Sequence, residues 1–284
     1  MQRFETVLRL MVRWLAILFA IFSITIALVP WDALSSRSIH LLFALALCFL
    51  SDGVLKNKNK TALPVAWYTL LATLAVACCV YIVVNAYELQ QERLGLFTME
   101  DRVFGGMLIV LIILATWKSF GGVMTMIVLS FMAYLFFGQY LPSSIGHPGI
   151  SLGRIIGNLG LSTEGVFGSP IGAATSVVSA FIIFASFLEV SGAANLFMSL
   201  SMAIFGRFTG GAAKVAVIAS SLFGAISGSA AANVAGTGMI TIPLMKKSGF
   251  SPRMAGAVEA TASSGGQIMP PVMGAAAFIM AEIL

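Results

Sequence analysis

Two runs of small and polar residues interrupt the most apolar part of the chain, and they are where it could bind a ligand. The first is Ser227-Gly228-Ser229, within the apolar stretch 214–247. Serine hydroxyls and backbone carbonyls are the oxygen ligands that a hard cation such as Na⁺ prefers, and glycine permits a turn. Asn233 adds an amide donor and acceptor one turn later. The pattern predicts two opposed helix ends, one suited to a cation and the other to an anionic group.

The second run, EATASSGGQIMPP at 259–271, predicts another helix break. Pro270 and Pro271 each remove a backbone donor and cannot continue a helix, and Gly265 and Gly266 loosen the chain before them. We expect this broken helix to accompany the first break. A proline kink without any ligand is the alternative. The polar side chains at the same depth are Thr261, Ser263, Ser264 and Gln267.

Basic residues flank the first break on both sides, and they predict its place in a membrane. Cytoplasmic ends of membrane segments are enriched in Lys and Arg, so both ends should lie on the same side. The arms 214–226 and 230–245 would reach roughly 20 to 24 Å as helices, short of the roughly 30 Å hydrocarbon core. We therefore expect a re-entrant helical hairpin, although small residues also occur where two helices simply pack closely. The flanking basic residues are Arg207, Lys214, Lys246, Lys247 and Arg253.

The composition excludes a water-soluble globular domain. Hydrophobic residues make up 59% of the chain and charged residues 10%, and the mean hydropathy is +0.99. The net charge of +5 comes from short loops beside apolar segments, so anchoring to the cytoplasmic face explains it better than nucleic-acid binding does. The three cysteines lie in apolar segments, and His40 and His147 have no ligand-spaced neighbour. We expect no disulfide framework, no metal-dependent chemistry and no enzyme.

The remaining apolar segments predict a polytopic all-α membrane protein whose N-terminus is cytoplasmic. The first apolar run should be a retained helix, because it lacks a small-residue cleavage site. Threading the chain places Lys56, Lys58, Lys60 and Lys118 inside, and the acidic loop 88–101 outside. Segments 150–161 and 193–208 should lie in the membrane plane, although the first could equally be a simple connector. The expected spans are 12–29, 39–50, 64–84, 103–116, 121–137 and 166–190.

Two glutamates lie close to apolar spans in the second half of the chain, Glu189 and Glu259. A carboxylate inside a membrane is a functional candidate, but both residues are close enough to span ends to sit at the interface. We expect them there. The sequence then offers no chain of intramembrane carboxylates for a proton relay, and Na⁺ is the preferred coupling ion.

Three runs, 184–192, 223–236 and 259–273, closely resemble the large membrane subunit of tripartite ATP-independent periplasmic (TRAP) transporters, and most of all the TAXI-type fused permease. The resemblance covers roughly the last 160 residues; the first 120 are similar in helix number and position. It implies a small-subunit-like scaffold at 1–120 and a connecting helix with an interfacial segment at 121–165. Residues 166–284 would be the first inverted repeat of an elevator-type transporter, with a hairpin at 214–245 and a broken helix at 252–284.

The resemblance also implies a function. A periplasmic binding protein of the TAXI type would deliver an organic acid, such as a dicarboxylate or glutamate, for Na⁺-coupled import across the bacterial inner membrane. By match to the family, the hairpin part of the substrate and Na⁺ region would contain Ser227, Gly228, Ser229 and Asn233. The broken helix behind it would contribute Thr261, Ser263, Ser264, Gly265, Gly266, Gln267 and Pro270. The ion itself would lie at Ser227, Ser229 and Gly265, and no other cofactor is implied.

One departure from the family is length. Its large subunit has two inverted repeats, whereas this sequence reaches only the first, so we expect a fragment of a longer fused permease. The sequence leaves open which carboxylate is carried, the Na⁺ stoichiometry and the oligomeric state.

Three other classes of protein fit the residues less well. The membrane subunit of an ATP-driven importer is the main alternative, because Glu259-Ala260 followed by Gly265 resembles the opening of an ATPase-docking loop. The prolines come too early for that loop. An intramembrane enzyme would need a Ser–His pair, an aspartate dyad or a zinc site, and no Asp follows Asp101. A structural anchor would leave two polar helix breaks without a purpose.

Overall fold

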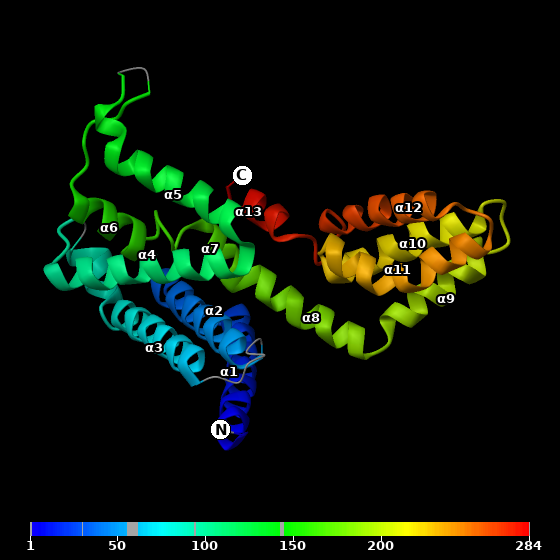
Figure 1. Ribbon diagram of the computed structural model, residues 1–284, viewed down its shortest axis with the longest axis horizontal. Coiled ribbons are helices and arrows are strands. Elements are labelled where there is room, and N and C mark those ends of the chain that lie inside the picture. The colour runs from blue at the N-terminus through cyan, green and yellow to red at the C-terminus, as the bar shows by residue number, and fades with distance from the viewer. Residues whose placement is uncertain (1, 30, 56–61, 94, 143–144, 284) are drawn as a thin grey trace. The chain divides into compact units, whose positions relative to one another are not determined.

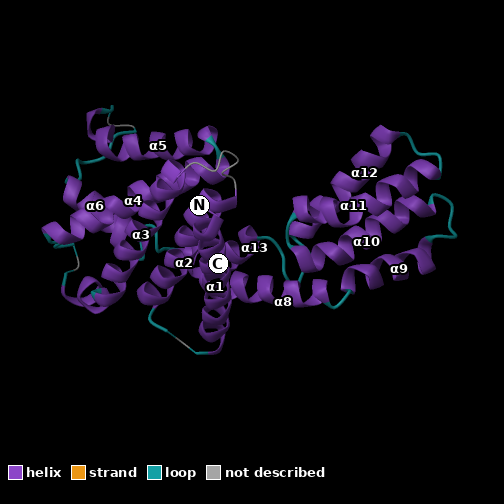
Figure 2. Cartoon of the chain, turned by 60° about the horizontal axis from the view of Figure 1, so that its bottom comes forward, coloured by secondary structure: helices purple, strands orange, loops and turns teal. Residues whose placement is uncertain are grey.

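The computed structural model describes residues 2–29, 31–55, 62–93, 95–142 and 145–283, and the side chains of these residues apart from 2–6, 52–55, 62–64 and 282–283. The described chain is helical and contains no strand (Figure 2). It divides into two compact units, residues 1–175 and 176–284. Because the described residues form helices and no strand, the predicted all-α fold is confirmed.

The first unit contains seven α-helices among its described residues (Figure 1). Its core forms chiefly where α2 packs on α3 and α4, around the fully buried side chains of Phe49, Ile82 and Leu108. The helix α6 packs against α4. The helices are α1 (Gln2–Leu28), α2 (Ala33–Leu55), α3 (Ala62–Val84), α4 (Met99–Phe120), α5 (Gly122–Phe137), α6 (Leu152–Leu161) and α7 (Ser169–Ala173), with a π-helical turn at Glu88–Glu92 and a 3₁₀ turn at Gly138–Tyr140.

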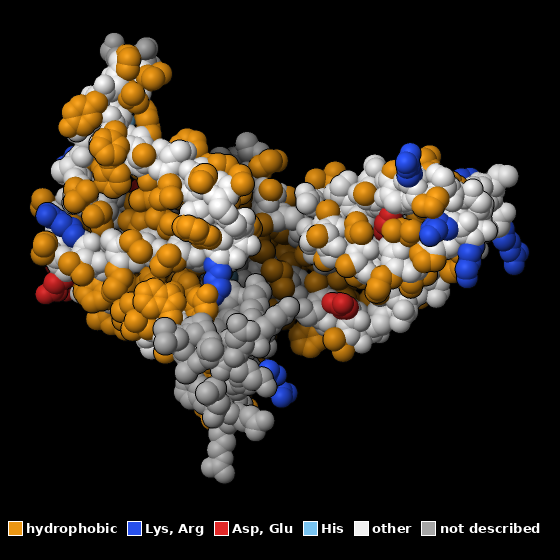
Figure 3. Space-filling view, viewed as in Figure 1, with side chains coloured by type: hydrophobic (Ala, Val, Ile, Leu, Met, Phe, Trp, Pro, Cys, Tyr) orange, Lys and Arg blue, Asp and Glu red, His pale blue; other side chains and the backbone are white. Residues whose placement is uncertain are grey.

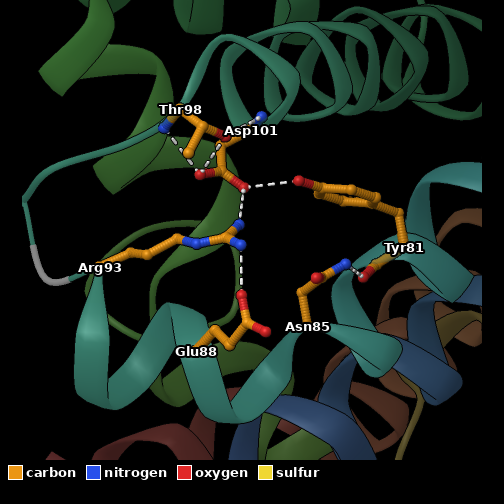
Figure 4. Close-up of polar contacts among 6 residues, drawn as sticks. All are labelled: Tyr81, Asn85, Glu88, Arg93, Thr98 and Asp101. Carbon is orange, nitrogen blue, oxygen red and sulfur yellow. Dashed lines mark hydrogen bonds and ion pairs between the residues drawn. The ribbon is translucent and has the colours of Figure 1, made fainter.

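The start of α4 is fixed by a buried carboxylate that has a cationic partner (Figure 4). Thr98 and Asp101 form a capping box, in which the Thr98 N–H and hydroxyl each donate to Asp101 Oδ2 at 2.8 Å. Asp101 Oδ1 accepts from the Tyr81 hydroxyl at 2.7 Å and from Arg93 Nη1 at 3.3 Å. Arg93 also pairs with Glu88. In this unit, then, a fully buried carboxylate is balanced by a guanidinium.

The second unit is a bundle of shorter helices in which α10 is central. It packs against α9, α11 and α12, and a small apolar cluster of Ala216, Met245 and Ala255 joins it to the last two. The helices are α8 (Ser179–Val190), which follows a π-helical turn at Ala174–Val178, α9 (Ala193–Phe205), α10 (Gly211–Ser227), α11 (Ala230–Lys247), α12 (Pro252–Ser264), a 3₁₀ turn at Gly265–Gln267, and α13 (Ala275–Ile283).

Six described helices are long and apolar enough to cross a membrane, and each contains one of the six expected spans or nearly all of it. The second and fourth spans are longer than expected, at 19 and 22 residues, because the helices continue through the polar residues around Arg37 and Arg102. Hydrophobic side chains cover much of the visible surface (Figure 3), as lipid contact requires. Lys56, Lys58 and Lys60 lie outside the described residues. The spans are Val7–Leu28, Ala33–Ser51, Val65–Val84, Met99–Phe120, Gly122–Tyr140 and Ser169–Val190.

Candidate functional site: two helix breaks and a buried carboxyl

The first break lies where the sequence predicts it. Helix α10 ends at Ser227, Gly228 adopts the left-handed conformation with φ +59°, and Ser229 caps α11 by accepting from the Ala232 N–H at 3.4 Å. The two arms have 17 and 18 residues and are roughly 26 and 27 Å long, a few residues more than expected. They still fall short of the roughly 30 Å hydrocarbon core. We call residues 227–229 the tip.

The second break also lies where it was predicted. Helix α12 ends at Ser264, and after the 3₁₀ turn the segment 268–274 leads to α13, with Pro270 and Pro271 in this non-helical segment. It docks on the end of α10, because the Val272 N–H donates to the Ala225 carbonyl at 3.1 Å. The space beside the tip is filled as well: a Cβ added to Gly228 would collide with the Met273 carbonyl oxygen.

Behind the tip, three elements meet around the amide of Asn233. Its Nδ2 donates to the carbonyl of Ser220 on α10 at 2.8 Å and to the carbonyl of Ser263 on α12 at 3.4 Å. The hydroxyls of Ser220 and Ser263 lie 2.9 Å apart, and all three side chains are fully buried. Two of the predicted site residues, Asn233 and Ser263, are thus brought together inside the helix packing.

Glu259 lies in this interior, packed between helices, and its expected depth at the membrane interface stays a prediction. Its side chain is fully buried. Oε1 accepts from the Thr237 hydroxyl at 2.5 Å and from the Ser263 hydroxyl at 3.1 Å, and Oε2 accepts from the Thr241 hydroxyl at 2.5 Å. The reason is helical geometry: residue 259 falls on the face of α12 that packs against α11, four residues before Ser263.

The signal for this cluster was present in the sequence. Asn233, Thr237 and Thr241 recur at intervals of four along one apolar helix, which places three polar side chains on one face. Glu259 and Ser263 have the same interval. A polar stripe on each of two helices inside an apolar segment indicates that the stripes pack against each other, since lipid would not solvate them.

A cavity of about 450 Å³ opens beside the tip, entirely within the second unit. Ser227 lines it from α10, Ala232 from α11, and Ser186 and Glu189 from α8. Glu189 is exposed, and its expected place at the membrane interface stays a prediction. Ser186 and Glu189 therefore join the candidate site, although sequence reasoning did not include them in it.

The predicted site residues divide into four groups, of which the buried pair Asn233 and Ser263 is the first. Ser227 and Ser229 lie together at the tip, where the Ser227 hydroxyl donates to the Ser229 carbonyl at 3.4 Å. The 3₁₀ turn that contains Gly265 touches α10 one turn before the tip, through a close approach of Gly266 to Gly224. The remaining residues are exposed and do not line the tip cavity: Thr261, Ser264, Gln267 and Pro270.

The tip offers oxygen atoms at the end of α10 and backbone N–H groups at the start of α11. The C-terminal carbonyls of α10 and the serine hydroxyls give hard ligands of the kind that suits Na⁺. The first turn of α11 gives backbone donors and the positive end of a helix dipole, which suits a carboxylate. No cluster of His, Cys, Asp or Glu that could hold another metal occurs among the residues that the structure describes.

The fold and these breaks define a polytopic helical membrane protein with interrupted helices around a polar interior. The family model of the tripartite ATP-independent periplasmic transporter, DctM component, matches residues 105–284. The chain belongs to this family.

Individual relatives match a shorter part of the chain. The chain is 36% identical over 91 residues to the uncharacterized protein YgiK of Salmonella typhimurium, which is 32% of this chain and 21% of that protein. It is also 36% identical over 91 residues to the C4-dicarboxylate TRAP transporter large permease protein DctM of Vibrio cholerae, covering 32% and 20%. The sialic acid TRAP transporter permease protein SiaT of Haemophilus influenzae is 29% identical over 91 residues, covering 32% and 15%. These matches span about a fifth of the relatives' length or less, and no solved structure matches the chain.

Proposed function

We propose that the chain is part of the membrane permease of a Na⁺-coupled, binding-protein-dependent secondary transporter that imports organic acids. The observation that carries the proposal is the tip, two opposed helix ends with serine oxygens beside a cavity, inside the segment that matches the DctM family. Relatives named for C4-dicarboxylate and sialic acid support a carboxylate substrate. A TAXI-type periplasmic protein would deliver the substrate at the bacterial inner membrane.

In this proposal, α10 and α11 form a re-entrant hairpin. Both of its ends carry basic residues, and neither arm is long enough to span the hydrocarbon core alone. The N-terminus would then be cytoplasmic. The unit 176–284 would be the moving part of an elevator, and the unit 1–175 would contain its scaffold.

Different groups at the tip would bind the cation and the substrate. Ser227 and Ser229, with Gly265, would supply hydroxyl and carbonyl oxygens to Na⁺. The free N–H groups at the start of α11 would bind the substrate carboxylate. Asn233 would hold the two arms together behind them through its bond to Ser220.

The test is uptake into proteoliposomes that contain the permease to which this chain belongs, with its binding protein. We expect a Na⁺ gradient to drive uptake, and Ser229→Leu to abolish most of it, because leucine removes a hydroxyl and crowds the tip. Ser199→Leu is the matched control, since Ser199 is exposed on α9. Uptake that needs ATP would favour an ATP-driven importer, and undiminished uptake by Ser229→Leu would remove the tip from the site.

A further inference from the structure

The cavity beside the tip is a groove between α8 and α11. Its lining residues on α8 recur at intervals of three and four over 182–189, and those on α11 do the same over 232–239. Such intervals mark one face of a helix, so each of the two helices turns one face toward the cavity. Phe223 and Ile226 line it from α10, which packs against both helices and forms the base of the groove. A volume of about 450 Å³ suits a small organic molecule.

The polar side chains of this groove offer acceptors. Those that line it are Ser186, Glu189 and Ser227. The Ser186 hydroxyl donates to the Ile182 carbonyl at 2.9 Å, and the Ser227 hydroxyl donates to the Ser229 carbonyl at 3.4 Å. Each serine therefore has only acceptor capacity left for a ligand, and a carboxylate is an acceptor as well. Donors come from the backbone at the start of α11, on the side of the tip.

Glu189 is the one charged side chain among the described residues that line the groove. It is exposed, and in the described part of the chain it has no ion-pair partner. A ligand with a second carboxylate would bring two negative charges into one cavity, and none of the lining residues is Lys or Arg. A ligand with a cationic group would instead compensate the charge of Glu189.

The rest of the lining is apolar or glycine, as at Ala185, Phe223 and Ala235. Such walls favour the burial of methylene groups. They offer no partner to a body that carries several hydroxyls, whose desolvation would stay uncompensated. The groove therefore suits a ligand with polar groups at its ends and an apolar chain between them.

We propose that this cavity selects a monocarboxylate whose other end is an ammonium or a similar cationic donor, and that Glu189 binds that cationic end. In the proposed function, on which this inference rests, the free N–H groups at the start of α11 bind the carboxylate. The substrate class is then the ω-amino acids and related zwitterions, and not the dicarboxylates. Glu189 attracts the first by charge-assisted hydrogen bonding and rejects the second by repulsion.

The test compares δ-aminovalerate, glutarate and valerate, which share a carboxylate and a chain length and differ at the far end. Calorimetry on the purified permease to which this chain belongs, in detergent with Na⁺, measures the affinity for each acid. We expect δ-aminovalerate to bind about tenfold more tightly than valerate, which is the effect of one hydrogen bond between charged groups. Glutarate should bind more weakly than valerate.

Variants at position 189 show whether this residue sets the preference. Glu189→Gln should lower the affinity for δ-aminovalerate to that for valerate and raise the affinity for glutarate. Glu189→Asp keeps the charge and should retain part of the preference, whereas Glu189→Lys should reverse it in favour of glutarate. The side chain is exposed, so these variants should fold, and thermal unfolding checks that they do. Glu100→Gln is the control, because Glu100 is exposed at the start of α4 in the other unit, and all three affinities should stay the same.

Failure of this inference and failure of the proposed function give different results. Wild-type protein that binds glutarate or valerate as tightly as δ-aminovalerate would refute the inference and leave the proposed function standing, and so would a preference that survives in Glu189→Gln. An equal loss of affinity for all three acids in Glu189→Gln would mean that Glu189 binds the coupling cation, which also refutes the inference. If none of the three acids binds to the wild type with Na⁺ present, the carboxylate site of the proposed function is wrong.

Discussion

The side-chain amide of Asn233 donates to the main-chain carbonyl of Ser220 at 2.8 Å, and this bond ties the two arms of the helix break together one turn behind the tip. The same amide reaches the carbonyl of Ser263, so one buried residue joins α10, α11 and α12.

Asn233→Asp should destabilise the second unit severely. The change keeps the shape but replaces the donating NH₂ group with an oxygen that faces the carbonyls of Ser220 and Ser263, and it introduces a buried negative charge without a cationic partner. The expected loss is about 3–5 kcal/mol of unfolding free energy, as for other uncompensated buried charges. Thermal unfolding in detergent at neutral pH measures it. Asn195→Asp is the control, because Asn195 is exposed on α9, and its midpoint should hardly change. Equal midpoints for the two variants would contradict the role of Asn233.

Gly224→Ala should force α10 away from the 3₁₀ turn after α12. An added Cβ would lie 2.6 Å from the Cα of Gly266 and 2.9 Å from Asn233 Nδ2, which its hydrogen bond to the Ser220 carbonyl holds in place. Overpacking of this kind costs about 1–3 kcal/mol. Gly256→Ala on α12 meets nothing within 4 Å and should stabilise the protein slightly, because alanine favours helix. Thermal unfolding of the Gly224→Ala and Gly256→Ala variants measures both effects. A Gly224→Ala variant as stable as wild type would mean that the backbones at Gly224 and Gly266 do not touch.

Gly228→Ala should destabilise the protein more than the same substitution at another glycine with a positive φ. Its φ of +59° is strained for alanine, and the new Cβ would also strike the Met273 carbonyl. Gly249→Ala shares the positive φ, at +93°, but meets no atom within 4 Å, so it should cost only about 1–2 kcal/mol. Comparing unfolding and Na⁺-driven uptake of the two variants separates backbone strain from loss of the tip. Similar behaviour of both would show that segment 268–274 does not dock there.

Asp32 should make stability depend on pH in the first unit. It caps α2 by accepting from the Ser35 N–H at 2.9 Å, and Gln90 also donates to it. Partial burial would raise its pKa, but these hydrogen bonds lower the pKa below the usual 3.8. A lowered pKa stabilises the folded state above pH 3.8, and this stabilisation is lost as the pH falls through the lowered value.

Asp32→Ala should therefore cost about 0.5–2 kcal/mol at neutral pH, as the loss of a helix cap does. The difference from wild type should shrink in acid. Unfolding midpoints of wild type and Asp32→Ala, measured from neutral pH down to acid, test both the cost at neutral pH and its decrease in acid. A difference that stays constant in acid would show that the carboxylate charge is not what stabilises α2.

The amino-acid sequence by itself determined the class of protein and both helix breaks. Long apolar runs must form helices in a membrane, because unpaired backbone groups cannot be left in lipid. Glycine and proline then interrupt those helices: Gly228 directly follows the last residue of α10, and Pro270 and Pro271 lie in the non-helical segment between α12 and α13. These are local effects, and local effects can be read along a single chain.

Only the tertiary structure decided where Glu259 lies. The four-residue interval between Glu259 and Ser263 indicates packing against another helix, but only the fold shows that the partners of Glu259 are Thr237 and Thr241, 22 and 18 residues earlier. Whether a carboxyl faces water or other helices depends on which helix faces meet, and that is settled by packing between elements distant in sequence. The same holds for the tip cavity, to which α8 contributes Ser186 and Glu189.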